Sequence, residues 1–181
     1  MTTSLSDVLS LCGIAINVIV LVFLVVQVWL LREQVNQAKD AFVKEQVLSR
    51  KQSTLEFMAN TVGRRHELAA LIPSEEEHSK VREFLRAFDD SSTTRRNLYD
   101  YLNYYEMLAT GANTDVLDID MVNRNTGGVV INIFKTYAAL IFRLRREQQR
   151  PTMYEELQIL ATRLSTMRGL PLPPSGEDQP A

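Results

Sequence analysis

Residues able to perform nucleophilic chemistry are few in this sequence. The single cysteine, Cys12, lies in an uncharged apolar run, and the two histidines are His66 and His78. A catalytic serine or cysteine needs a base within hydrogen-bond reach, and the Gly-x-Ser-x-Gly motif of serine hydrolases is absent from the sequence. We therefore expect no enzyme activity, no catalytic residue and no bound cofactor.

Two acidic motifs match metal sites only in part. Glu75-x-x-His78 is half of a di-iron signature, which needs two Glu-x-x-His helices and two further carboxylates. The aspartates Asp115, Asp118 and Asp120 lack the order and the closing glutamate of a calcium loop. We expect a solvated helix start in the first case, an ordinary turn in the second, and no metal site.

Two other patterns suggest anion binding. The pair Gly127-Gly128 precedes Lys135 as in a phosphate-binding loop, but Phe134 stands where that loop has glycine. A basic helix end contains Arg143, Arg145, Arg146 and Arg150. These arginines either contact anionic lipid or a phosphate ligand, or they complement the negative end of a helix dipole. We expect the second role, and we reject the phosphate loop.

Glu106 is the acidic residue whose position is most informative. It lies one turn after Leu102 and beside Tyr105 in an amphipathic segment, so it falls at the edge of the predicted core. A carboxylate that is partly buried needs a partner. We predict a structural ion pair with Arg143, at the end of the most apolar helix; the alternative is that Glu106 faces water.

An uncharged apolar segment, Val8 to Leu31, contains Cys12 and precedes all the other residues discussed above. As a helix it exceeds the hydrocarbon core of a bilayer, about 30 Å thick. A cleaved signal peptide is the alternative, but the preceding MTTSLSD lacks the basic residues that a signal peptide needs. We therefore predict an uncleaved transmembrane helix over residues 8–31, after a short extracytoplasmic N-terminus over residues 1–7.

Charged flanks predict the orientation of this anchor. Five basic residues follow it within twenty positions, and none precedes it: Arg32, Lys39, Lys44, Arg50 and Lys51. The positive-inside rule then places the C-terminal part in the cytoplasm and the N-terminus outside. The lack of disulfides fits a cytoplasmic body. We predict a single-pass protein of the cytoplasmic (inner) membrane, in contact with membrane lipid.

Small and polar residues form a stripe on the predicted anchor, at Ser6, Ser10, Gly13 and Asn17. Small residues let membrane helices approach closely, and an asparagine in the membrane seeks a partner. We predict transmembrane self-association through this stripe, and hence a homo-oligomer. The alternative is that Asn17 is tolerated alone in an apolar helix.

A long linker helix is predicted over residues 32–72, which contain one glycine and no proline. Its apolar residues repeat every seven positions, at Leu48, Leu55, Val62 and Ala69, and Met58 and Ile72 flank the same face. This pattern predicts either a coiled-coil stalk or a helix that packs on its own domain. Lys51, Thr54 and Arg65 are weak coiled-coil core residues, so we expect a stalk to about Arg50 and packing on the domain after it.

A helical module is predicted over residues 73–168. Ser74 and Glu77 form a capping box for its first helix. A second helix starts near Thr93 and ends at Gly111, a glycine in the usual place after a helix. Asp118 is then predicted to cap a short helix.

The rest of the module contains the most apolar cytoplasmic segment. Thr126-Gly127-Gly128 is predicted to break or bend the chain before the core helix that follows. Thr152 and Glu155 form a second capping box, for the last helix. The proline-rich tail, residues 169–181, is predicted to be disordered.

Several of these features together resemble a known family. An apolar anchor, a charged linker helix, the segments LNYYEMLATG and VLDID, and an apolar helix that ends in arginine are similar to the bacterial and phage family called domain of unknown function 4760. The resemblance covers residues 8–150 and is most specific at Asn103, Glu106, Ala109, Gly111 and residues 116–120. It implies a small membrane-anchored helical protein without a known activity. Relatives in prophage and mobile contexts suggest defence or exclusion.

We therefore expect an all-α protein, with a transmembrane helix that continues into a long amphipathic helix and then a bundle of about four or five helices. The predicted function is protein interaction or sensing at the cytoplasmic membrane face, with an unknown cytoplasmic protein as partner. The alternative is a membrane effector that forms a pore or lesion when the module is triggered. A net charge of −2 over 181 residues predicts no nucleic-acid partner.

Overall fold

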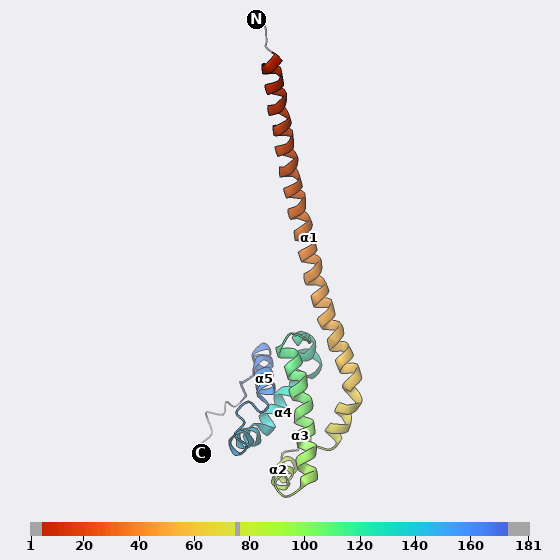
Figure 1. Cartoon of the computed structure of the whole chain (residues 1–181). Coiled ribbons are helices and arrows are strands. Elements are labelled where there is room, and N and C mark those ends of the chain that lie inside the picture. The colour runs from red at the N-terminus through yellow and green to blue at the C-terminus, as the bar shows by residue number, and fades with distance from the viewer. Residues whose placement is uncertain (1–4, 75–76, 174–181) are drawn as a thin grey trace. The chain divides into compact units, whose positions relative to one another are not determined.

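Helices form all the regular secondary structure in the described part of the chain. A computed structural model describes residues 5–74 and 77–173, without the side chains of residues 5–16 and 18. Within these residues it contains five α-helices (Figure 1): α1 (Leu5–Ala70), α2 (His78–Ala87), α3 (Ser92–Asn113), α4 (Ile119–Glu147) and α5 (Glu155–Met167). The predicted all-α fold is confirmed.

The chain divides into two compact units, Met1–Val47 and Leu48–Ala181. In the first unit, every described side chain is exposed. The second unit contains the hydrophobic core, which is built mainly from α3, α4 and α5 and has Tyr105, Phe134 and Tyr137 among its largest fully buried side chains. The second compact unit therefore begins within α1, at Leu48, and includes the last part of the segment predicted as a linker helix.

The part of α1 in the second unit packs on the core through a face that overlaps the predicted one only in part: Met58 is partly buried, and Ile72, just after α1, is buried. The heptad positions Leu48, Leu55, Val62 and Ala69 are all exposed. The buried side instead carries Thr54 and Leu68, with Phe57 and Met58 partly buried. Sequence spacing favoured the heptad positions, whereas the structure packs the neighbouring positions, which include two threonines.

Hydrogen bonds explain why threonines lie on the packed face of α1. Thr54 is fully buried; its Oγ1 donates to the Arg50 carbonyl at 2.7 Å and accepts from the backbone N–H of Asp118 at 2.7 Å. Thr61 Oγ1 lies 3.1 Å from the hydroxyl of Tyr104. Both hydroxyls have partners, so their burial carries no cost of unsatisfied polar groups.

The starts of α2, α3 and α4 differ in how well local sequence predicts them. Asp118 caps α4 as predicted, because its carboxylate accepts from the backbone N–H of Met121 at 2.9 Å. Ser91 caps α3, so that helix starts slightly before Thr93. The capping box at Ser74 is wrong: α2 begins at His78, and Glu77 occupies the N-cap position without a side-chain cap.

Two glycines predicted to interrupt helices lie inside them instead. Gly111 is within α3, which continues to Asn113, and a Cβ on it would lie 2.8 Å from Leu117 Cδ1. Gly127 is buried within α4, where a Cβ would lie 2.8 Å from a guanidinium nitrogen of Arg168. Both glycines therefore make room for a side chain from a later segment, and the predicted helix end and chain break are wrong.

Candidate functional site

Two helices among the described residues are long and apolar enough to cross a membrane, by length and composition alone. The first lies in α1, within Ile19–Ala70, and none of its most apolar stretch is buried. The second is α4, but 61% of its apolar stretch is buried inside the molecule. Because α4 already covers its apolar surface with its own domain, only α1 leaves such surface uncovered.

The apolar side chains of α1 are exposed throughout the described part of the predicted anchor. Side chains from Ile19 to Leu31 are exposed, including Phe23 at 60% and Trp29 at 64%. Asn17, the last residue of the predicted association stripe, is exposed as well. The side chains of Ser6, Ser10 and Gly13 lie outside the described residues, so the stripe stays a prediction.

A polar junction joins α3 to the start of α5, and Glu106 is at its centre. Its two carboxylate oxygens accept from the backbone N–H groups of Glu156, at 3.3 Å, and Leu157, at 2.8 Å. These N–H groups belong to the first turn of α5 and have no partner within the helix. Glu106 therefore does, from another helix, what an N-cap side chain does locally.

The local sequence at the start of α5 explains why this cap comes from α3. The residue at the N-cap position is Tyr154, which has a left-handed backbone (φ 56°) and makes no side-chain cap. Thr152 contributes its carbonyl, which accepts from the N–H of Glu155 at 3.2 Å, within a turn. The predicted capping box of Thr152 and Glu155 is therefore wrong.

The surroundings of Glu106 shift its pKa in opposite directions. Burial raises the pKa of Glu106, the two backbone N–H groups lower it, the neighbouring Glu156 carboxylate raises it and Arg145 lowers it; the net direction is upward. The side chain of Asn113 donates to the Glu156 carboxylate at 2.7 Å. Arg163 donates in turn to the side-chain amide oxygen (Oδ1) of Asn113 at 3.0 Å. The network fixes α5 on α3, which indicates a structural role.

The predicted ion pair between Glu106 and Arg143 is wrong. Arg143 makes a bidentate pair with Asp89, with both N–O distances 2.9 Å, and this pair raises the pKa of Arg143. The cation that acts on Glu106 is Arg145, which donates to the Met153 carbonyl at 2.8 Å. Two positions along a helix rotate a side chain by about 200°, so these two arginines serve different neighbours.

The acidic residues considered as metal ligands have other roles where the structure describes them. Asp118 caps α4, and Asp115 lies 3.8 Å from Arg50. Within residues 5–74 and 77–173, no group of three or more His, Cys, Asp and Glu side chains could hold a metal ion. Glu75 lies outside the described residues.

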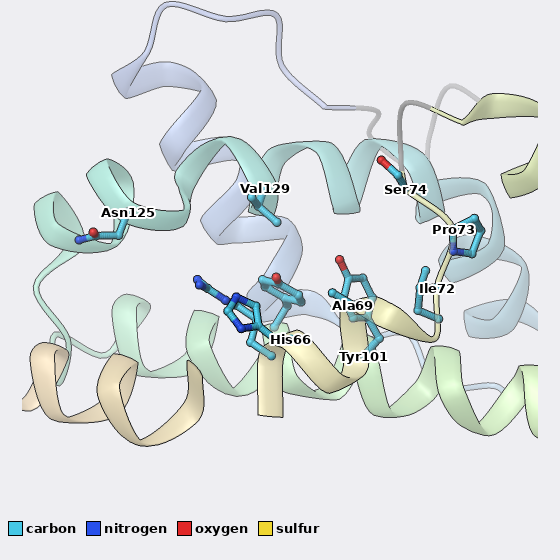
Figure 2. A pocket seen from close by; sticks show the side chains of 10 residues that line it. His66, Ala69, Ile72, Pro73, Ser74, Tyr101, Asn125 and Val129 are labelled. Carbon is cyan, nitrogen blue, oxygen red and sulfur yellow. The ribbon is translucent and has the colours of Figure 1, made fainter. Parts of the chain in front are cut away.

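One pocket, of about 380 Å³, was not foreseen from the sequence (Figure 2). It is enclosed by the end of α1, by the segment that directly follows α1, by α3 and by α4. Its lining residues are Arg65, His66, Ala69, Ile72, Pro73, Ser74, Tyr101, Tyr105, Asn125 and Val129. Figure 2 shows Asn125 and Val129 on α4, across the opening from His66 and Ala69 on α1. The signal for this pocket in the sequence is the adjacent basic pair Arg65-His66 in a helix that packs on the domain.

A comparison with family models identifies the family of this chain. The model described as Domain of unknown function (DUF4760) matches residues 16–164. The chain belongs to this family. The match includes the exposed apolar run of α1, Glu106 and every residue that lines the pocket, so these features lie within the DUF4760 region. No curated protein and no solved structure matches the chain.

Proposed function

We propose that this DUF4760 protein is a single-pass membrane protein that presents a helical interaction or sensing module at the cytoplasmic face of the inner membrane. The observation that carries the proposal is the fully exposed apolar run of α1, from Ile19 to Leu31. Leaving so large an apolar surface in water is unfavourable, and a bilayer covers it. The basic residues from Arg32 to Lys51 support a cytoplasmic module.

Binding rather than catalysis is favoured by the rest of the chain. The polar junction around Glu106 holds two helices together through hydrogen bonds that are already satisfied. The partners that we propose are membrane lipid, a second copy of the chain and a cytoplasmic protein. A second copy anchored in the same membrane would have a parallel α1, and the exposed heptad of Leu48, Leu55 and Val62 would then meet its own counterpart.

Membrane insertion is tested by changing the apolar run. The Val20→Arg/Leu24→Arg variant of the full chain should move from the membrane fraction to the soluble or aggregated fraction, because each arginine at a helix centre costs about 2.5–3.5 kcal/mol of insertion free energy. The matched control is Leu55→Arg, an exposed apolar residue of the same helix outside the run, which should stay in the membrane after carbonate extraction. Equal extraction of wild type and double variant would contradict the anchor.

Orientation and oligomerisation need separate measurements. A reporter that is active only in the cytoplasm, fused after Ala181, should be active; a periplasmic reporter active there would contradict the orientation. Asn17→Leu should weaken self-association in a membrane two-hybrid assay by about 0.6 kcal/mol, and an unchanged signal would remove the stripe's proposed role.

Measuring the membrane potential distinguishes the alternative function, a membrane effector, from the proposed interaction or sensing module. A scaffold or sensor should leave the potential intact when the full chain is overexpressed. An effector should collapse it, and the Val20→Arg/Leu24→Arg variant should abolish the collapse.

A further inference from the structure

We propose that the pocket between α1, α3 and α4 binds a small phosphate monoester with an apolar or aromatic body. This inference rests on the packed unit alone and does not depend on membrane anchoring. It is carried by an arginine that has no counter-ion among the described residues, by the polar groups around it and by the apolar walls of the pocket.

The first observation is a contrast between two neighbouring arginines of α1. Arg64 lies 3.4 Å from the carboxylate of Glu67 and 3.7 Å from that of Asp100. Arg65 is half-buried and lines the pocket. In the part of the chain that the structure describes, Arg65 makes neither an ion pair nor a hydrogen bond. Partial burial of a charge is unfavourable without a partner, so Arg65 is suited to an external anion.

The second observation is the set of polar groups at the same opening. His66 and Asn125 line the pocket together with Ser74, and all three are exposed. None of the lining residues is acidic. A guanidinium offers a fork of donors that matches phosphate oxygens, and imidazole, amide and hydroxyl groups can add further hydrogen bonds. An anion would therefore meet donors from α1, from the segment after it and from α4.

The third observation is the apolar remainder of the pocket. Ala69, Ile72, Pro73 and Val129 form part of its wall, together with the rings of Tyr101 and Tyr105. A volume of about 380 Å³ lies within the range of about 300–1,000 Å³ for small-molecule sites. Phosphate alone would leave these walls without contacts. The pocket therefore suits a phosphate joined to an apolar or aromatic group, either a soluble metabolite or the headgroup region of an acidic phospholipid.

The test uses the full chain in uncharged detergent micelles, with phenyl phosphate as the soluble probe. Saturable binding by calorimetry is expected, at least about tenfold tighter than that of inorganic phosphate, since the ring adds burial. Phenol, which has the same ring without the charge, should bind at least about tenfold more weakly than phenyl phosphate. Equal affinity for phenol and phenyl phosphate would overturn the anion assignment.

The matched variants are Arg65→Met and Arg64→Met, adjacent residues of the same type. Arg65→Met should weaken phenyl phosphate binding by about tenfold or more, whereas Arg64→Met should leave it unchanged, because Arg64 does not line the pocket. Val129→Trp, which fills the pocket and leaves Arg65 in place, provides a second route to loss of binding should Arg65→Met unfold the chain. Equal weakening by the two arginine variants, or full binding by Val129→Trp, would overturn the site.

The remaining arms address the neighbouring acids and the source of the phosphate. Glu75 and Glu76 follow Ser74 in the sequence and lie outside the described residues; Glu75→Gln/Glu76→Gln should bind phenyl phosphate at least as tightly as wild type, and weaker binding would contradict an anion site. Native mass spectrometry from nanodiscs with phosphatidic acid tests the lipid source. Retention of one lipid, lost in Arg65→Met, would assign the phosphate to a lipid. Absence of both phenyl phosphate and lipid binding would overturn the proposal.

Discussion

The apolar runs of α1 and α4 have similar compositions and opposite environments. None of the apolar stretch of α1 is buried, whereas 61% of that of α4 is. Both helices are long and apolar enough to cross a membrane, and they differ in how much of the apolar stretch is buried. Apolar composition therefore indicates that a helix must be covered, and the tertiary structure shows whether the protein itself covers it. The predictions below test this contrast, beginning with the packed helix.

A charge in the core of α4 should have the largest effect on stability. Ile133 is completely buried, so Ile133→Asp places an unpaired charge among apolar side chains and should cost roughly 4–5 kcal/mol or more. Thermal unfolding followed by circular dichroism should show this destabilisation as the loss of the cooperative transition. The matched change in the exposed run, Leu24→Asp, should leave the melting transition of the module unchanged; a similar loss would mean that the run is packed.

Glu106→Ala should have the next largest effect, because it removes the cap of α5 from a distance. Two backbone N–H groups, of Glu156 and Leu157, lose their acceptor, and loss of a helix cap costs about 1–2 kcal/mol of unfolding free energy. Urea unfolding of the full chain in detergent measures it. Asn103→Ala, an exposed residue of the same helix, is the control and should be neutral.

The same carboxyl should also make stability depend on pH. Burial raises the pKa of Glu106 in the folded protein above the ordinary value of 4.5, so the folded state binds more protons than the unfolded state between the two values. The stability that arises from this raised pKa is fully present below pH 4.5 and is lost as the pH rises through the raised pKa. The hydrogen bonds that Glu106 accepts from α5 are a separate contribution. Glu106→Gln should flatten this slope, measured as unfolding free energy against pH; an unchanged slope would contradict the shift.

Thr54→Val should destabilise the module by about 1 kcal/mol. The substitution keeps the shape of the side chain and leaves the Asp118 backbone N–H without its acceptor at 2.7 Å. Leu55→Ser is the control on the exposed heptad stripe, where Leu55 is 58% exposed in the single chain; in dilute detergent that keeps the chain monomeric, it should change the unfolding free energy by less than about 0.5 kcal/mol. A larger loss for Leu55→Ser than for Thr54→Val would show that the apolar stripe is covered, for example by a second copy.

Arg143→Ala should have the smallest effect. Its bidentate partner Asp89 has a side chain that is 57% exposed, and exposed pairs contribute at most about 1 kcal/mol. A double-mutant cycle with Asp89→Ala should show coupling, and a cycle with Glu106→Ala should be additive. Coupling between Arg143 and Glu106 would restore the pair that the spacing suggested.

Sequence by itself determined the features that depend on neighbouring residues. The helical class and the burial of Leu102 and Tyr105 in α3 follow from periodicity. The Asp118 cap follows from an interaction over three positions. The apolar run of α1 can also be identified from the sequence, because its residues are consecutive. Such features need no knowledge of how one helix is placed against another.

Tertiary structure alone decided the features that join distant segments. Glu106 accepts a hydrogen bond from the backbone of Leu157, 51 positions later. Thr54 accepts one from the backbone of Asp118, 64 positions later. Gly127 leaves space for the side chain of Arg168. The pocket likewise combines three separate helices. The physical reason is that a helix fixes which residues share a face, while the rotation and contact partner of that face are set by packing among all the helices at once.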